Sequence, residues 1–170
     1  MKLFLFLTFF ISNVVVAQEV YQTPEDFLKE TFQNSVPEPR LLWLTGERQK
    51  VAEQILGHKS TSLRIRYWKM GEKSAWILDE VGKDKPITTG VVINQDKIEQ
   101  LKVLIFRESR GWEIKYPFFT DQFKETQLKA DFNLNKTIDG ISGATLSVKA
   151  LQKVARLALY LHQQTALEKL

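Results

Sequence analysis

Cysteine is absent from the 170 residues. Its absence excludes disulfides, thiolate-held iron-sulfur clusters, cysteine nucleophiles and haem attached through a Cys-x-x-Cys-His motif. Histidine is scarce as well, since His58 and His162 are the only two and no carboxylate pattern at metal-ligand spacing surrounds them. We expect structural roles for both, His58 at one helix end and His162 in the last turns of another, where an imidazole favours the helix dipole. Any redox chemistry must therefore come from another kind of cofactor.

A strong excess of charge is also missing. The chain carries 24 Lys and Arg against 20 Asp and Glu, a formal net charge of +4. The two signs are interspersed, as in Lys29-Glu30 and Glu47-Arg48. A nucleic-acid-binding protein usually gathers its cations into one patch or stripe. We therefore expect no nucleic acid among the partners.

Long apolar runs are limited to one, from Leu3 to Val16, which follows Met1-Lys2. The run is shorter than the roughly 20 apolar residues of a transmembrane helix. A basic start, an apolar centre and modest residues before Gln18 are the layout of a signal peptide. We predict that residues 1–17 are cleaved after Ala17, which places the mature protein in the periplasm or another extracytoplasmic compartment. The alternative is an uncleaved N-terminal anchor.

The remainder has the size of one domain, and its patterns predict an α+β fold. Two short helices are expected at residues 24–32 and 45–56, separated by a proline-containing connector. From Ser62 onward apolar residues alternate with polar ones, and short turns separate four expected strands near 63–68, 75–78, 87–93 and 98–106. Such strands form an antiparallel β-meander. We divide the chain into an N-terminal helical extension, residues 18–61, and a main domain, residues 62–170.

A long amphipathic helix ends the chain and is expected to pack on one face of the sheet. We expect it to start near Ser142 and to fray after Gln164. Its apolar residues fall on one stripe at helical spacing, and they are Leu151, Val154, Ala155, Ala158 and Leu161.

The segment before this helix, residues 139–147, reads Asp-Gly-Ile-Ser-Gly-Ala-Thr-Leu-Ser. Ser142 suits the N-cap, the glycines permit a tight turn, and Thr145 falls in the first helical turn. A helix start offers unpaired N–H groups and the positive end of the helix dipole, which favour a phosphate. The simpler interpretation is that these residues only cap a helix.

The same segment resembles the flavinylation motif of the FMN-binding domain family, which includes subunits of sodium-pumping and related quinone or ferredoxin oxidoreductases. Its acid corresponds to Asp139, its hydroxyl residue to Ser142, and its two small residues to Gly143 and Ala144. By this resemblance Thr145 accepts FMN through a phosphoester, transferred from FAD by a Mg²⁺-dependent flavin transferase. Residues 62–170 would then be the FMN-binding domain.

The resemblance covers about residues 87–162 and includes the loop after the fourth strand. Family members commonly have Glu-Thr-Pro-Gly-Leu-Gly there, whereas this chain has Glu-Ser-Arg-Gly-Trp-Glu at residues 108–113, so only Glu108 and Gly111 match. The loop is expected near the flavin, where Glu108 lies and where Trp112 stacks on the isoalloxazine ring. Tyr116 and Phe118 are further aromatic candidates, although we expect them rather in the core.

The resemblance implies an exported electron-transfer protein, because the flavin performs the redox chemistry and the protein binds and orients it. Redox partner proteins, with haem proteins or a membrane reductase as candidates, would donate and accept the electrons. One alternative is a flavin-dependent reductase of a small substrate, with Glu108 or Arg110 as proton donor. Another is a flavin-free binding module of the cell envelope, with Thr145 simply buried.

Overall fold

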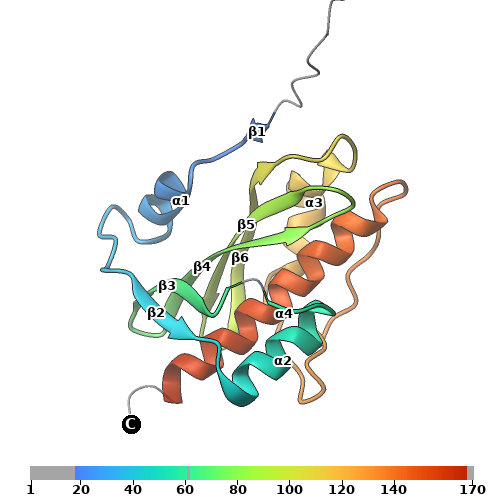
Figure 1. The fold of residues 1–170 in the computed structure, drawn as a ribbon. Helices are drawn as coiled ribbons and strands as arrows, with labels where there is room; N and C mark the ends of the chain where they lie inside the picture. Colours follow the sequence, from blue (N-terminus) through green and yellow to red (C-terminus); the bar gives the residue numbers. More distant parts are fainter. Residues whose placement is uncertain (1–17, 61, 168–170) are drawn as a thin grey trace, which may run out of the picture.

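A computed structural model describes residues 18–60 and 62–167, and the predicted signal peptide lies outside them (Figure 1). Within this part the strands are β1 (Glu19–Val20), β2 (Arg40–Trp43), β3 (Arg64–Met70), β4 (Lys73–Val81), β5 (Pro86–Asn94) and β6 (Lys97–Phe106). The α-helices are α1 (Pro24–Thr31), α2 (Gly46–Leu56), α3 (Pro117–Thr120) and α4 (Thr145–Leu167), and two 3₁₀ turns are η1 (Trp112–Lys115) and η2 (Asp121–Phe123).

The described strands form one antiparallel sheet in the order β1-β6-β5-β4-β3-β2. β3 to β6 are joined by short turns, so the predicted meander and the α+β class are confirmed. The two edge strands β1 and β2 were not predicted, because a strand of two or four residues is too short for an alternating pattern to stand out. Residues 18–60 thus supply both edges of the sheet in addition to α1 and α2.

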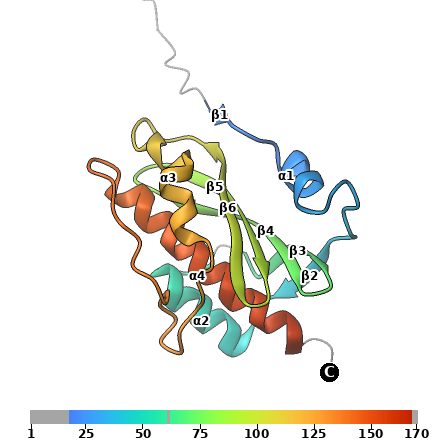
Figure 2. The same ribbon diagram turned by 180° about the vertical axis from the view of Figure 1, so that it is seen from behind.

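The sheet lies between helices on its two faces (Figures 1 and 2). The predicted C-terminal helix, α4, packs against β4, β5 and β6 on one face, and α2 packs against α4. The apolar stripe of α4 is fully buried in this main core, where Leu151, Ala155 and Leu161 are 0% exposed. α1 covers part of the other face, with Phe27 over Ala75 and Val92 in a second, smaller core. Burial of these two apolar layers is the main favourable contribution to folding.

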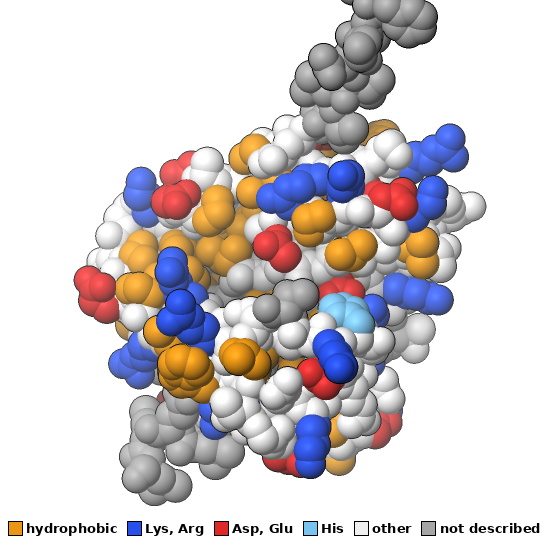
Figure 3. Space-filling model, viewed as in Figure 1, with side chains coloured by type: hydrophobic (Ala, Val, Ile, Leu, Met, Phe, Trp, Pro, Cys, Tyr) orange, Lys and Arg blue, Asp and Glu red, His pale blue; other side chains and the backbone are white. Residues whose placement is uncertain are grey.

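α1 leaves part of its face of the sheet uncovered. Hydrophobic side chains gather there with Lys and Arg side chains among them, between α1 and β2 at the left of Figure 3. Leu41 and Trp43 of β2 are 46% and 51% exposed. A cavity of about 380 Å³ lies between these elements and is bordered by Arg64 and Arg66 of β3.

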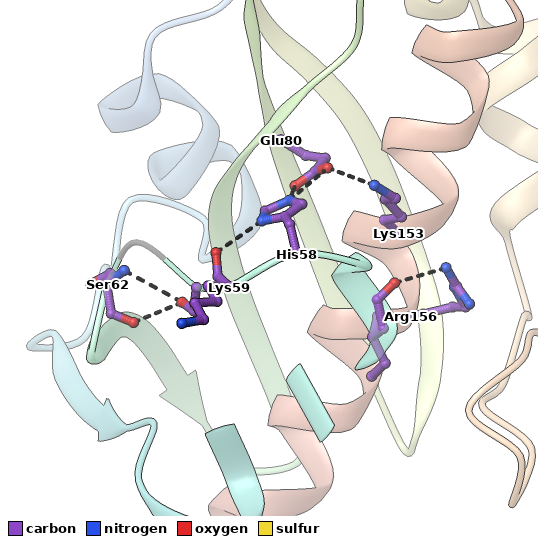
Figure 4. A network of polar contacts seen from close by, with 8 residues as sticks. His58, Lys59, Ser62, Glu80, Lys153 and Arg156 are labelled. Atoms are coloured by element: carbon purple, nitrogen blue, oxygen red, sulfur yellow. Dashed lines mark hydrogen bonds and ion pairs between the residues drawn. The ribbon is translucent and has the colours of Figure 1, made fainter. Parts of the chain in front are cut away.

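A buried carboxylate links three segments of the main core (Figure 4). Glu80 of β4 is 4% exposed and accepts hydrogen bonds from Lys153 Nζ of α4 at 3.0 Å and from His58 Nε2 at 3.0 Å. His58 Nδ1 lies 2.9 Å from the carbonyl oxygen of Lys59. Both ring nitrogens therefore face acceptors, and both can donate only when the imidazole is protonated. The pKa of His58 is raised, first by the bond to the Lys59 carbonyl and then by Glu80.

The pKa of the second histidine is shifted in the opposite direction. His162 of α4 is 4% exposed, and its Nδ1 lies 2.6 Å from Ser74 Oγ. Burial lowers the pKa of His162, and the charge of Lys69 lowers it further. The lowered pKa disfavours the charged form, which is the form that the expected interaction with the helix dipole would need.

Candidate functional site

The site begins with a tight turn that leads into α4. The amide of Ala144 donates to the carbonyl of Ile141 at 3.0 Å, and Gly143, the third residue of this turn, has a φ of +82°. A turn of this kind with positive φ at its third position favours glycine. The first helical bond runs from the amide of Val148 to the carbonyl of Ala144 at 2.9 Å. α4 therefore starts at Thr145, three residues later than predicted.

The turn changes the expected role of Ser142. Ser142 is exposed in the turn, and Ala144, whose side chain cannot accept a hydrogen bond, occupies the capping position. The prediction of Ser142 as N-cap is wrong because Gly143 redirects the chain after it. Among the described residues no hydrogen bond uses the amides of Thr145, Leu146 and Ser147. Such amides, at the positive end of a 23-residue helix, favour an anion.

Thr145 borders a cavity of about 460 Å³ that three segments enclose. These segments are the turn between β4 and β5, the loop after β6, and the start of α4. The lining residues are Lys83, Glu108, Ser109, Arg110, Gly143, Ala144, Thr145, Leu146 and Ser147. Thr145 is exposed, whereas Ser147 is 5% exposed. The cavity thus combines an accessible hydroxyl group, unpaired amides and two cationic side chains.

Glu108 fixes one wall of the cavity. Its Oε1 accepts hydrogen bonds from the amides of Lys83, Asp84 and Lys85, at 2.5, 2.8 and 3.0 Å. The carboxylate therefore joins the loop after β6 to the β4–β5 turn. Because these three bonds engage Oε1 as an acceptor, the interactions of Glu108 favour a structural role over that of a free proton donor.

Gly111 brings the loop after β6 against the start of α4. Its φ is +85°, and a Cβ atom added there would lie 2.8 Å from Ser147 Oγ and 3.2 Å from the Cβ of Ala144. The close approach leaves no room for a side chain, and the backbone conformation also favours glycine. Gly111 is one of the two residues that match the family pattern in this loop.

The aromatic residues after Gly111 lie on the surface. Trp112, Tyr116 and Phe118 are 44%, 41% and 63% exposed, so the expectation that Tyr116 and Phe118 belong to the core is wrong. The ring of Tyr116 lies 5.7 Å from that of Trp112 and 6.2 Å from that of Phe118. Lys115 Nζ lies 5.4 Å from the Trp112 ring centroid. The three rings form an exposed aromatic group close in sequence to Gly111, and none of them borders the cavity beside Thr145.

The cavity thus brings together part of the predicted site. Thr145, Gly143, Ala144 and Glu108 border it, whereas Asp139, Ser142 and Trp112 do not. The side chain of Asp139 is exposed, and its amide donates to Gln122 Oε1 at 2.7 Å. Sequence patterns do not indicate Lys83 or Leu146 as site residues. Lys83 falls in a predicted turn, but only the pairing of β4, β5 and β6 and the bonds of Glu108 bring that turn beside Thr145.

Within the described ranges 18–60 and 62–167, no group of three or more His, Asp or Glu side chains is placed to hold a metal ion. No helix in those ranges is long and apolar enough to cross a membrane.

Comparison with known proteins identifies one family. Residues 82–160 match the model of the FMN-binding domain, a range that takes in the whole lining of the cavity. The match agrees with the resemblance expected over residues 87–162. Neither a curated protein nor a solved structure matches the chain.

Proposed function

We infer from the FMN-binding domain at residues 82–160 that the chain is a flavin-binding protein. We propose that its FMN is attached to Thr145 through a phosphoester and that the exported protein carries electrons between redox partners. A flavin transferase that uses FAD and Mg²⁺ would perform the attachment. The observation that carries the proposal is the exposed hydroxyl of Thr145 at the first residue of α4, beside amides without partners.

The residues present fit an FMN phosphate. A phosphodiester on Thr145 keeps one negative charge, which the helix dipole and the amides of Thr145, Leu146 and Ser147 favour. The small side chains of Gly143 and Ala144 leave the hydroxyl open to the active site of a second protein. Asp139 and Ser142 are exposed just before it, where a transferase can read them.

The cavity also suits the flavin in size. Its volume of about 460 Å³ lies within the roughly 300–1,000 Å³ of small-molecule sites. Leu146, which is 47% exposed, borders the cavity. Trp112 lies two residues after Arg110 of the cavity lining, and its exposed ring offers a stacking surface. When bound, the flavin supplies reversible uptake and release of electrons. The protein holds the phosphate at the helix start and shields part of the ring.

Two observations favour a carrier over a reductase of a small substrate. Glu108, one proposed proton donor, is engaged by three amides of the β4–β5 turn. The exposed aromatic group of Trp112, Tyr116 and Phe118 offers a surface near the site that a partner protein can contact. Arg110 remains as the donor in the reductase alternative, although an arginine keeps its proton at ordinary pH.

The test is to express the chain with a flavin transferase and to measure in-gel flavin fluorescence after denaturation. We expect fluorescence in the native chain and its loss in Thr145→Ala, because that change removes the hydroxyl and alanine is a good helix residue. Thr137→Ala is the matched control, since this exposed threonine lies outside both the motif and the cavity beside Thr145. Circular dichroism checks the fold of each variant.

Two results would contradict the proposal. Fluorescence that persists in Thr145→Ala would place the acceptor elsewhere, with Ser142 and Ser147 as the next candidates. A native chain without covalent flavin, although folded and co-expressed with an active transferase, would leave two alternatives, non-covalent binding of FMN and the flavin-free binding module of the envelope.

A further inference from the structure

We infer that Lys83 and Arg110 form a cationic pair that raises the reduction potential of the flavin bound in the cavity. The inference rests on the proposed function only in its location of the flavin beside Thr145. It assigns a role to two residues that the family motif does not include.

The two cations come from different segments and border one cavity. Lys83 lies in the turn whose amides Glu108 holds, and Arg110 follows Glu108 by two residues. One carboxylate therefore fixes the turn that carries Lys83 to the loop that carries Arg110. Gly111, packed against Ala144 and Ser147, holds this loop against the helix start.

The charges around the cavity are unbalanced. Glu108 is the one carboxylate among the described lining residues, and its Oε1 is engaged by three amides. Arg110 makes no ion pair with any carboxylate that the structure describes. Lys83 lies 3.6 Å from Asp84, but both side chains are mostly exposed, at 73% and 63%, and such pairs are weak. A ligand in the cavity thus meets a net positive wall.

The phosphate has partners of its own, apart from the two cations. The unpaired amides of Thr145, Leu146 and Ser147 lie at the helix start, where the phosphodiester would be attached. Lys83 and Arg110 are therefore available to the rest of the flavin. The oxidised ring is neutral, whereas reduction adds negative charge to it, so neighbouring cations stabilise the reduced form more than the oxidised form. This difference raises the reduction potential.

The experiment compares the midpoint potentials of flavin-loaded variants in a redox titration followed by absorbance. Lys83→Gln and Arg110→Gln keep the amides and the chain length, and Lys85→Gln is the matched control because its side chain lies on the same turn but outside the cavity lining. We expect a more negative potential in each of the first two, a larger shift in the double variant, and no shift in the control. Added salt should reduce the shifts, because exposed charges are screened. Arg110→Lys keeps the positive charge and should therefore keep most of the native midpoint potential that Arg110→Gln loses.

The outcomes separate the inference from the proposed function. Unchanged potentials in the double variant would overturn the cationic pair, as would a lowered flavin content with an unchanged potential in the loaded fraction, which would assign the two residues to attachment. Failure of covalent attachment would appear as loss of in-gel fluorescence in the native chain. In that case the same titration on protein reconstituted with free FMN tests the pair.

Discussion

The ion pair between His58 and Glu80 makes the stability of the fold depend on pH in a direction that can be worked out. Both ring nitrogens face acceptors, which favours the charged imidazole in the folded protein, and the pKa of His58 is accordingly raised. Its stabilising contribution is fully present below the unfolded pKa of about 6.5 and is lost as the pH rises through the higher folded pKa. The pair is only partly shielded from solvent, since the His58 side chain is 46% exposed and that of Glu80 is 4% exposed. We therefore expect a contribution of about 1 kcal/mol at most.

The perturbation is His58→Asn, compared with the native chain in urea unfolding from pH 5.5 to 8.5. Tryptophan fluorescence can report the transition, because buried Trp76 stacks on Tyr67 at a centroid distance of 4.9 Å. The native chain should be the more stable at low pH, by at most about 1 kcal/mol, and the difference should shrink as the pH rises. His162 acts in the opposite direction, because its pKa is lowered and its contribution is lost as the pH falls. Subtracting the two curves removes this shared effect.

The partner provides the control. In a Glu80→Gln background the substitution His58→Asn should cost less and should lose part of its pH dependence, because the carboxylate is gone while the Lys59 carbonyl still favours the imidazolium. A stability difference between the native chain and the His58→Asn variant that stays constant, or grows with pH, would refute the assignment of a protonated His58.

Three further predictions concern the site and the maturation of the chain. Gly111→Ala should lower the free energy of unfolding by about 1–3 kcal/mol, and by more than Gly143→Ala does. Both glycines have a positive φ, but of the two only Gly111 faces neighbours within 4 Å. Equal costs in urea unfolding would contradict the close contact of Gly111 with α4. The mature exported protein should begin at Gln18, and an intact mass that retains residues 1–17 would instead support the anchor. The dithionite-reduced flavoprotein should pass electrons to a protein partner such as a haem protein faster than to small acceptors in stopped-flow measurements, and saturable turnover of one small acceptor without response to any protein would favour the reductase.

Most of the sheet could be predicted because its signals are local. β3 to β6 each show alternating or continuous apolar residues, and a short turn marks each boundary. The edge strands escaped prediction, since Arg40–Trp43 becomes a strand only through its pairing with β3. Similarly, aromatic residues without periodicity do not reveal their burial, and Tyr116 and Phe118 proved exposed while nearby Phe119 is fully buried.

In the candidate site, likewise, only the residues with a local sequence signal could be predicted. Thr145 and the small residues before it belong to one contiguous motif, so the sequence locates the helix start to within a turn. The residues that face it, Lys83 and Arg110, lie 62 and 35 positions earlier in the chain. Their approach depends on the pairing of β4, β5 and β6 and on the bonds of Glu108, which no local pattern encodes.

Under the proposed export, the two-residue strand β1 bears on the order in which cleavage and folding occur. Glu19 and Val20 pair with Phe106 and Ile105 of β6, directly after the predicted cleavage position. A peptidase needs the chain around Ala17 and Gln18 extended and accessible, which a strand already docked at the sheet edge would hinder. Cleavage after Ala17 should therefore precede the pairing of β1 with β6, and β1 would be the last strand to join the sheet. In a chain that keeps its leader, the same edge beside β6 would become the point of attachment to the membrane.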